Sequence, residues 1–296
     1  MASLKEVRTR ISSVNSTRQI TSAMKMVAAS KLRRAQNAIL SMRPYAQKLH
    51  SIMQDISSDL DNSEEGVYST NREDNTILIV TITANRGLCG AFNTNVVKSA
   101  INLINVKYSA QYKKGNVHFL CIGKKGADGL ISNGYKPIDL ITDIFDHLTF
   151  DNAVPIAEEL MMLYTSKKYD KIILVYNQFK NAAVQLLQEE QFLPVVNAGE
   201  NKDSKKEEPQ ANYIFEPNKE EILEALVPKV IKVQLYKALL DSLASEHGAR
   251  MTAMHQATEN ADELLKDLKL TYNKARQASI TNEILEIVGG AEALNG

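Results

Sequence analysis

Residues 4–36 read LKEVRTRISSVNSTRQITSAMKMVAASKLRRAQ, and the spacing of apolar residues in this stretch decides the fold. Apolar or small side chains recur at alternating steps of three and four, and the pattern continues to residue 60. A period of 3.5 residues held over about eight heptads indicates one strand of a left-handed coiled coil, which a single surface helix does not need. The positions are Leu4, Val7, Ile11, Val14, Arg18, Thr21, Lys25, Ala28, Leu32, Ala35, Ile39, Met42, Ala46, Leu49, Met53, Ile56 and Leu60.

The C-terminal part of the chain repeats this pattern. From residue 230 to residue 288 there is no proline and a single glycine, Gly248, so one helix is expected over the whole distance. We expect this helix to pair antiparallel with the first one. Matching the polar positions 18–25 to the polar positions 247–250 makes facing residue numbers add up to about 270 and predicts an external contact site there. The predicted positions are Ile222, Leu226, Lys229, Val233, Tyr236, Leu240, Leu243, His247, Arg250, Met254, Ala257, Ala261, Leu264, Leu268, Thr271, Ala275, Ala278, Asn282 and Leu285.

The middle of the chain reads as an α/β domain inserted between the two helices. Runs rich in β-branched residues alternate with helical patterns, which favours right-handed βαβ units and a Rossmann-like, mostly parallel sheet. An edge strand is expected at 183–187 and an exposed mobile loop at 199–212. The predicted domains are 1–62, 75–217 and 218–296, with strands at 76–84, 117–122 and 171–176 and helices at 94–108, 125–133 and 152–166.

The charge of the chain is balanced overall but not along its length. The 35 basic and 35 acidic residues cancel, yet residues 1–50 hold ten Lys or Arg and one Glu, a net charge of +9. Such a stretch is either a solvated face or a contact for an acidic partner. The two cysteines, Cys89 and Cys121, are too few for a disulfide scaffold, and no apolar run is long enough to span a bilayer.

The sequence lacks the motifs of an enzyme or of a cofactor site. The glycine-containing loops at 85–92 and 123–126 have neither the GxGxxG spacing nor the GKS/T of a phosphate-binding loop. The five histidines are scattered, with no HExxH, and no GxSxG occurs. We therefore predict no catalytic residue, no cofactor and no metal site.

Two other functions remain open at this point. A coiled-coil arm could bind nucleic acid or an acidic partner through its basic helix, although residues 1–50 offer one aromatic residue, Tyr45, for stacking on bases. A nucleotide-dependent α/β enzyme with a dimerising coiled coil would need the loop from Gly87 to Gly90 to hold phosphate.

Four long motifs resemble one known family. They are RQITSAMKMVAASKLRRAQ at 18–36, NRGLCGAFN at 85–93, SEHGARMTAMHQATENADEL at 245–264 and YNKARQASITNEILEIVGGAEAL at 272–294. In order and distance they are similar to the γ subunits of F-type ATP synthases, and with the helix–α/β–helix layout they cover nearly the whole chain. The resemblance implies a non-catalytic rotor: an antiparallel coiled coil inside a ring of three α and three β subunits, with its foot on the ε subunit and the ring of c subunits. Ion flow through the c ring would turn it and drive the β catalytic sites through their conformations.

The resemblance also assigns residues. Arg86 matches an arginine that contacts a β subunit, and Arg276 and Gln277 match a pair that hydrogen-bonds to a β-subunit loop. Met24 and Arg250 lie in the motifs near the acidic loop through which β pushes on the shaft. The apolar tip held in the α/β bearing would be formed by Ile280, Ile284, Leu285, Ile287 and Val288.

The resemblance extends to location and regulation. The chain starts with a helical pattern and shows no presequence, which points to a bacterial protein at the cytoplasmic face of the plasma membrane, attached through the c ring. The loop at 199–212 has no cysteine pair, so the thiol switch of chloroplast members is not expected. Aspartate in place of Leu32 or Leu264 is expected to be strongly destabilising, because both are predicted to lie in the coiled-coil interface.

Overall fold

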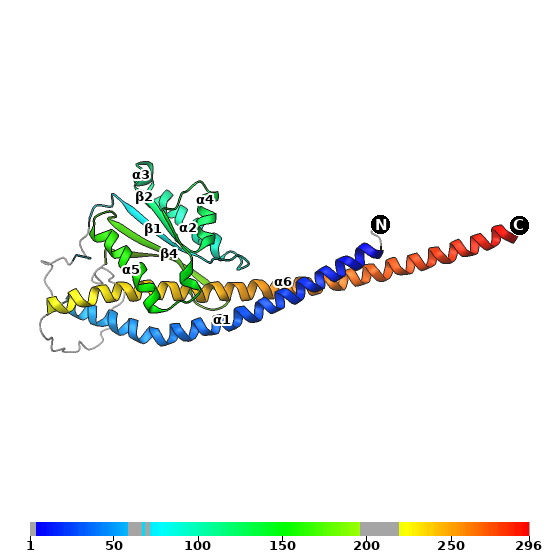
Figure 1. The fold of residues 1–296 in the computed structure, drawn as a ribbon, viewed down its shortest axis with the longest axis horizontal. Coiled ribbons are helices and arrows are strands. Elements are labelled where there is room, and N and C mark those ends of the chain that lie inside the picture. The colour runs from blue at the N-terminus through cyan, green and yellow to red at the C-terminus, as the bar shows by residue number, and fades with distance from the viewer. Residues whose placement is uncertain (1–3, 59–66, 69–71, 196–218, 296) are drawn as a thin grey trace. The chain divides into compact units, whose positions relative to one another are not determined.

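The computed structural model describes residues 4–58, 67–68, 72–195 and 219–295. They form two compact units, one of Met1–Ala29 with Arg250–Gly296 and one of Ser30–Ala249. Two long helices contribute to both units: α1 (Leu4–Ser58) and α6 (Lys219–Asn295), which begin and end the described chain (Figure 1). Among the described residues no helix is both long and apolar enough to cross a membrane.

The Ser30–Ala249 unit is built on a five-stranded sheet with the strand order β3-β2-β1-β4-β5. The first four strands are parallel, with Val80 facing Leu120 on one side and Leu174 on the other, and β5 is antiparallel to β4. The strands are β1 (Ile77–Ile82), β2 (Val117–Ile122), β3 (Asp139–Ile141), β4 (Lys171–Phe179) and β5 (Gln185–Leu193).

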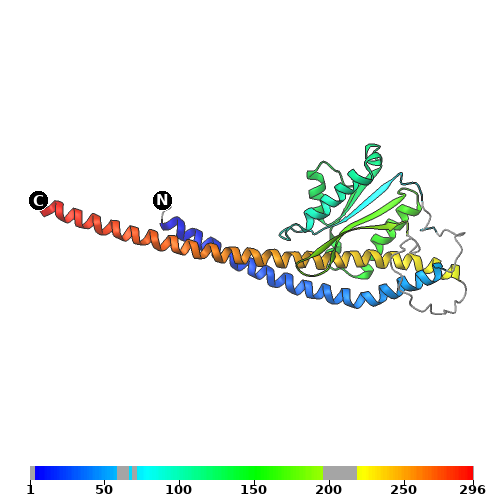
Figure 2. The ribbon, with the colours of Figure 1, turned by 180° about the vertical axis from the view of Figure 1, so that it is seen from behind.

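Helices cover both faces of this sheet (Figures 1 and 2). One face packs on α2 and α4, the other on α5 and on the part of α6 that belongs to this unit. The alternation of strands and helices, parallel apart from the antiparallel edge strand β5, confirms the predicted fold class. The helices are α2 (Phe92–Lys107), α3 (Ser109–Lys113), α4 (Lys124–Ser132), α5 (Phe150–Thr165) and a short 3-10 turn, η1 (Asp143–Phe145).

The central strand β1 explains why both faces must be covered. All six of its residues, ILIVTI, are buried, and alternate side chains enter opposite cores. Leu78, Val80 and Ile82 pack towards α5 and α6, whereas Ile77 and Ile79 pack towards α2 and α4. A strand without a polar face is typical of a parallel sheet buried between two layers of helices.

In the other unit, the N-terminal part of α1 packs antiparallel against α6 as the heptad pattern predicts. Val7 and Ala28 are buried, and the positions of Leu4, Ile11 and Val14 are half-buried. The predicted register is wrong, however. The Arg18 guanidinium donates to Asp262 at 3.1 Å and the Thr21 hydroxyl lies 2.9 Å from that of Thr258, so facing residue numbers add up to 279 or 280.

The shift has a simple physical reason. The expected register placed Arg18 and Lys25 opposite His247 and Arg250, which would bring like charges together in the interface. The observed register gives Arg18 a carboxylate partner instead, and His247 is buried within the Ser30–Ala249 unit. The predicted facing of these two polar stretches is therefore not realised.

The predicted interface positions Met254, Ala261 and Leu268 of α6 are confirmed, but Leu264 is not. Met254, Ala261 and Leu265 are buried and Leu268 is half-buried, whereas Leu264 is 44% exposed. Since residues 264 and 265 are both leucine, a pattern of apolar spacing cannot tell which of the two faces α1. The destabilising effect expected for aspartate at 264 therefore belongs to position 265.

Several elements differ from the sequence expectation. The β3 strand was not expected, because its three residues are exposed or half-buried and give no apolar run. The β5 strand is longer than the predicted edge strand at 183–187. The predicted loop at 199–212 and the predicted interface residue Leu60 lie outside the described residues.

Candidate functional site

The residues singled out as contact sites belong to both units. Arg86 lies in the Ser30–Ala249 unit, whereas Met24, Arg250, Arg276 and Gln277 lie in the unit of Met1–Ala29 and Arg250–Gly296. The candidate site is therefore a set of separate surfaces. We describe each surface with the elements that hold it.

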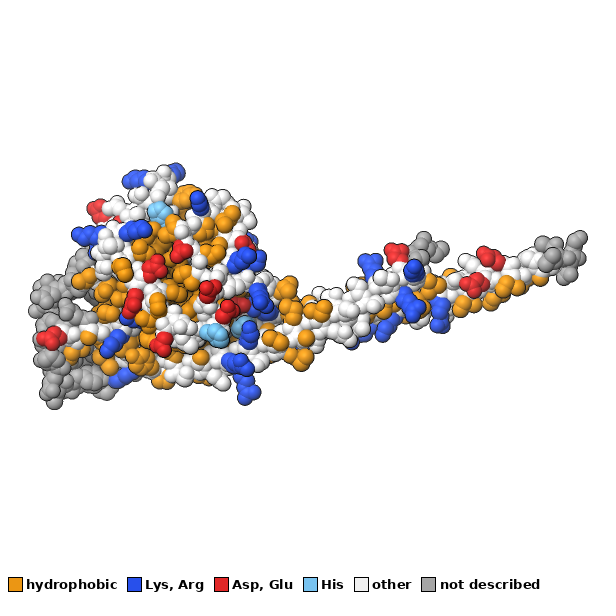
Figure 3. Space-filling view, in the orientation of Figure 1, with side chains coloured by type: hydrophobic (Ala, Val, Ile, Leu, Met, Phe, Trp, Pro, Cys, Tyr) orange, Lys and Arg blue, Asp and Glu red, His pale blue; other side chains and the backbone are white. Residues whose placement is uncertain are grey.

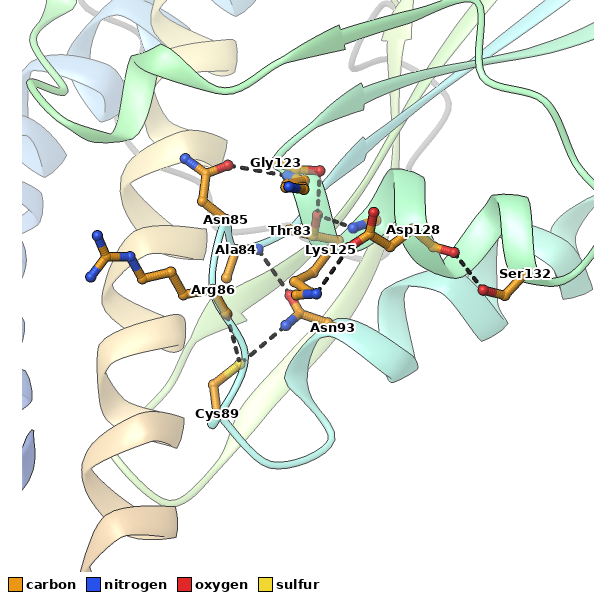
Figure 4. A network of polar contacts seen from close by, with 12 residues as sticks. Thr83, Ala84, Asn85, Arg86, Cys89, Asn93, Gly123, Lys125, Asp128 and Ser132 are labelled. Carbon is orange, nitrogen blue, oxygen red and sulfur yellow. Dashed lines mark hydrogen bonds and ion pairs between the residues drawn. The ribbon is translucent and has the colours of Figure 1, made fainter. Parts of the chain in front are cut away.

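The first surface is the loop that follows β1, residues 85–91, which we call the 85–91 loop (Figure 4). Its ends are held by side chains: the backbone N–H of Ala84 donates to Asn93 Oδ1 at 2.9 Å, and Asn93 Nδ2 donates to Cys89 Sγ at 3.2 Å. Asn85 Nδ2 donates to the Thr142 carbonyl at 2.7 Å. Cys89 is buried against Ala84 and Phe92, which fixes the middle of the loop to the sheet edge.

Two side chains of this loop are exposed. Arg86 extends away from the polar network in Figure 4, and Leu88 is 62% exposed. Leu88 also has a φ of +62°, in the left-handed region where a side chain costs about 1–2 kcal/mol. The loop therefore combines a firmly held base with an exposed arginine and an exposed leucine.

In the second glycine-containing loop, at 123–126, the space beside the glycines is occupied by Thr83. A Cβ on Gly123 would lie 2.0 Å from the Thr83 carbonyl oxygen, and one on Gly126 would lie 2.6 Å from Thr83 Oγ1. The Gly126 N–H, which a phosphate would need, donates to Thr83 Oγ1 at 2.8 Å. Close packing against Thr83 thus accounts for both glycines, and sequence spacing gave no sign of it.

A third feature is the attachment of α6 to the sheet within the Ser30–Ala249 unit. Tyr176 on β4 donates to Glu190 Oε2 at 2.6 Å, and Gln234 on α6 donates to Glu190 Oε1 at 2.7 Å. Burial raises the pKa of Tyr176, and the Glu190 carboxylate raises it further. The phenol therefore stays protonated and keeps donating, so the three side chains join α6, β4 and β5.

Further contacts strengthen this attachment. Lys232 on α6 donates to Glu158 on α5 at 2.6 Å. Gly248 allows a close approach, because a Cβ there would lie 3.2 Å from the Cα and carbonyl oxygen of Ala182 in the β4–β5 turn. The sequence pattern predicts a polar interruption of a coiled coil at 247–250, but the structure has a group of buried polar residues there: Asp241, Ser242, Ser245, Glu246 and His247.

The polar positions of the other unit are used for pairing between helices. The Arg18–Asp262 ion pair and the Thr21–Thr258 hydrogen bond occupy the α1–α6 interface. Met24 and Arg250, the two residues expected to face an acidic partner loop, are both half-buried. A groove between α1 and α6 in this unit is lined by Arg8, Arg18, Lys266 and Lys269 along with Asp262, so its surface is mainly basic.

The last surface is the C-terminal end of α6. The observed register places Leu4, the first described residue of α1, opposite residue 275 or 276. Beyond that point hydrophobic side chains follow one edge of the helix (Figure 3). Arg276 and Gln277 are exposed, as are the five predicted tip residues: Ile280, 47%; Ile284, 55%; Leu285, 62%; Ile287, 71%; and Val288, 50%.

The described residues present no cluster of possible metal ligands. Within ranges 4–58, 67–68, 72–195 and 219–295, no three His, Cys, Asp or Glu side chains come together as metal ligands would. The Cys121 thiol is buried, which raises its pKa to about 11 and leaves it without the thiolate character of a nucleophile.

Comparison with known proteins gives a consistent result. The family model described as ATP synthase matches residues 3–294. The chain is 59% identical over 298 residues to the ATP synthase gamma chain of Christiangramia forsetii and 45% identical over 296 residues to that of Chlorobium phaeobacteroides, with both chains covered completely in each case.

Solved structures agree with the fold. A chain of the rotor of the Euglena gracilis mitochondrial ATP synthase matches with a TM-score of 0.66 and 24% identity, covering 94% of this chain and 98% of that one. A chain of the central stalk and c ring of the Tetrahymena thermophila enzyme matches with a TM-score of 0.56 and 26% identity, covering 80% and 99%.

Proposed function

Because the chain belongs to the family of ATP synthase γ chains, we propose that it is the rotating central shaft of such a synthase. Ion flow turns a c ring, the chain turns with it, and its asymmetric surface drives the β-subunit catalytic sites through their conformations in turn. The chain couples these two processes and performs no chemistry itself. The lack of a cluster of metal ligands among the described residues is compatible with that role.

One observation carries the proposal: α6 is a single helix of 77 residues with two differently used ends. Near its start, Ile231, Leu235 and Leu239 belong to the core of the α/β unit, and Gln234 is hydrogen-bonded to the sheet. At its other end the apolar residues are exposed. A helix fastened into one body and exposing apolar side chains elsewhere is suited to transmit torque to a surrounding partner.

The proposed partners follow the family. One copy of the chain stands in the centre of a ring of three α and three β subunits, and its α/β unit contacts the ε subunit and the c ring. We propose that Met24, Arg86, Arg250, Arg276 and Gln277 contact the ring, and that Ile280, Ile284, Leu285, Ile287 and Val288 form the tip inside its bearing. Since the γ chains of Christiangramia forsetii and Chlorobium phaeobacteroides are bacterial proteins, we place the complex at the cytoplasmic face of the plasma membrane.

Family membership favours the shaft over the two alternatives raised by the sequence, a nucleic-acid-binding arm and a nucleotide-dependent enzyme. On the basic helix, Arg18 is paired with Asp262 within the chain. We therefore propose neither.

The test is reconstitution. The chain is co-expressed with α and β subunits of the same organism, and the product is analysed by native mass spectrometry and by an ATPase assay. We expect a complex of three α, three β and one copy of this chain, with ATPase activity that is lost when the chain is left out. A chain that stays apart from the α and β subunits would refute the proposal.

A further inference from the structure

The groove between the N-terminal part of α1 and α6 carries more positive than negative charge. Its volume is about 690 Å³, within the range of roughly 300–1,000 Å³ that is usual for ligand sites. Lys and Arg side chains gather over this part of the helix pair in Figure 3. Four cationic side chains and one carboxylate line the groove, a net charge of +3: Arg8, Arg18, Lys266, Lys269 and Asp262.

Three of these cations have no acidic partner in the part of the chain that the structure describes. The Asp262 carboxylate is occupied by Arg18, whose guanidinium donates to it at 3.1 Å. Arg8, Lys266 and Lys269 form no ion pair with any described residue. Like charges that line one groove repel one another, and a bound anion relieves this repulsion. The groove therefore has positive charge to offer to an anionic ligand.

The three unpaired cations lie close together along the groove. Lys266 and Lys269 are three residues apart on α6, so they share one side of the helix and are separated by about 4.5 Å along its axis. The observed register places Lys269 opposite residue 10 or 11 of α1, and Arg8 lies within one turn of that point. One ligand can therefore contact cations from both helices.

The other lining residues narrow the chemistry of the ligand. Ser12 and Asn15 offer a hydroxyl and an amide group as neutral hydrogen-bond donors. Leu265 is buried and Ile11 is half-buried, so part of the lining is apolar, which strengthens the attraction between charges. None of the described residues that line the groove is aromatic, so a nucleic-acid base has no ring to stack on.

An oligophosphate chain fits these features. It carries negative charge on every phosphate group, so it meets several separated cations at once, and Arg and Lys are well suited to bind phosphate oxygens. We propose that this groove binds an oligophosphate chain, either free or as part of a nucleotide, between Arg8 of α1 and Lys266 and Lys269 of α6. The site goes beyond the proposed function, because binding there requires neither the α/β ring nor the c ring.

The experiment is isothermal titration calorimetry of the isolated full-length chain with sodium triphosphate. Lys269→Gln is compared with Lys274→Gln, which removes the same charge from an exposed position of the same helix outside the groove. We expect Lys269→Gln to bind about tenfold more weakly, as loss of one charged hydrogen bond implies, and Lys274→Gln to match the wild type. Asp262→Asn, which removes the carboxylate from the groove, should bind about threefold more tightly.

The outcomes separate a site from general attraction. A wild-type chain that does not bind triphosphate would overturn the proposal, and so would equal losses in Lys269→Gln and Lys274→Gln. If Lys269→Gln fails to fold, Arg8→Gln replaces it with the same expected loss.

Titration with ATP distinguishes the two sources of the phosphate chain. Binding as tight as that of triphosphate would support a nucleotide as the ligand, and weaker binding would support a free oligophosphate. Binding of ATP much tighter than that of triphosphate would overturn the proposal, because groups other than the phosphate chain would then be recognised.

Discussion

Apolar residues are buried in one part of helix α6 and exposed in another. Between residues 231 and 248 nearly every side chain is buried or half-buried, including Asp241, Glu246 and His247. Between residues 280 and 291 every residue is exposed, and the first of them, Ile280, is already 47% exposed. The apolar residues of the first segment are explained by packing within the chain. Those of the second segment are explained only by contact with a partner.

The sharpest test of this difference introduces the same charge into both segments. Leu235→Asp places a carboxylate in a fully buried position and should destabilise the chain by about 4 kcal/mol or more. Leu285→Asp, at a site 62% exposed, should change the free energy of unfolding of the isolated chain by no more than about 0.5 kcal/mol. Urea unfolding of the two variants measures both values.

In the assembled complex, unlike in the isolated chain, Leu285→Asp should also have an effect. Leu285→Asp is expected to weaken the ATPase activity that depends on the chain, although the isolated chain is stable. Equal behaviour of Leu285→Asp and the wild type in the complex would mean that the exposed tip does not contact the bearing.

A second prediction tests which leucine of α6 faces α1. Leu265→Ala removes a side chain that is 7% exposed and should cost about 2–3 kcal/mol. Leu264→Ala, at a position 44% exposed, should cost less than about 1 kcal/mol. The pair is measured by thermal unfolding, and the reverse ranking would restore the positions expected from the sequence pattern.

A third prediction uses two glycines of α6. Gly248→Leu must displace the backbone of Ala182 and should destabilise the chain by about 2 kcal/mol. Gly289→Leu meets nothing within 4 Å and should stabilise the helix by up to about 1 kcal/mol, because leucine is the better helix former. Circular dichroism at increasing temperature follows both, and a neutral Gly248→Leu would show that the β4–β5 turn does not press on α6.

The smallest effect on stability is expected at the predicted contact pair. Arg276→Ala removes an exposed side chain and should change the stability of the isolated chain by less than about 0.5 kcal/mol. In the full synthase we expect the ratio of ions pumped to ATP hydrolysed to fall. Unfolding of the isolated variant would instead make Arg276 a structural residue.

Much of the fold could be predicted because it depends on repeated patterns. The heptad positions of α1 and the β-branched runs of β1, β2 and β4 appear in the sequence with the period that their packing requires. The β3 strand could not be predicted, because Asp139–Ile141 has no buried side to leave an apolar pattern. The register of the two helices was wrong because it was matched by polarity alone, without the pairing of Arg18 with Asp262.

Less of the candidate site than of the fold could be predicted from the sequence. Arg86, Arg276, Gln277 and the tip residues came from a family resemblance, and their contacts remain proposals. Nothing in the spacing of 85–91 signalled that Leu88 has a positive φ, because that depends on how Cys89 and Asn93 hold the loop.

The central claim is that the chain rotates within a ring of catalytic subunits. It is tested most directly by attaching a bead to a new cysteine at Val106, which is 70% exposed, while Cys89 and Cys121 are buried and protected from labelling. The complex with α and β subunits is fixed to a surface through the ring, and ATP is added. We predict rotation of the bead in one direction that stops when ATP is removed. A bead that stays fixed while the complex hydrolyses ATP at its normal rate would contradict the account.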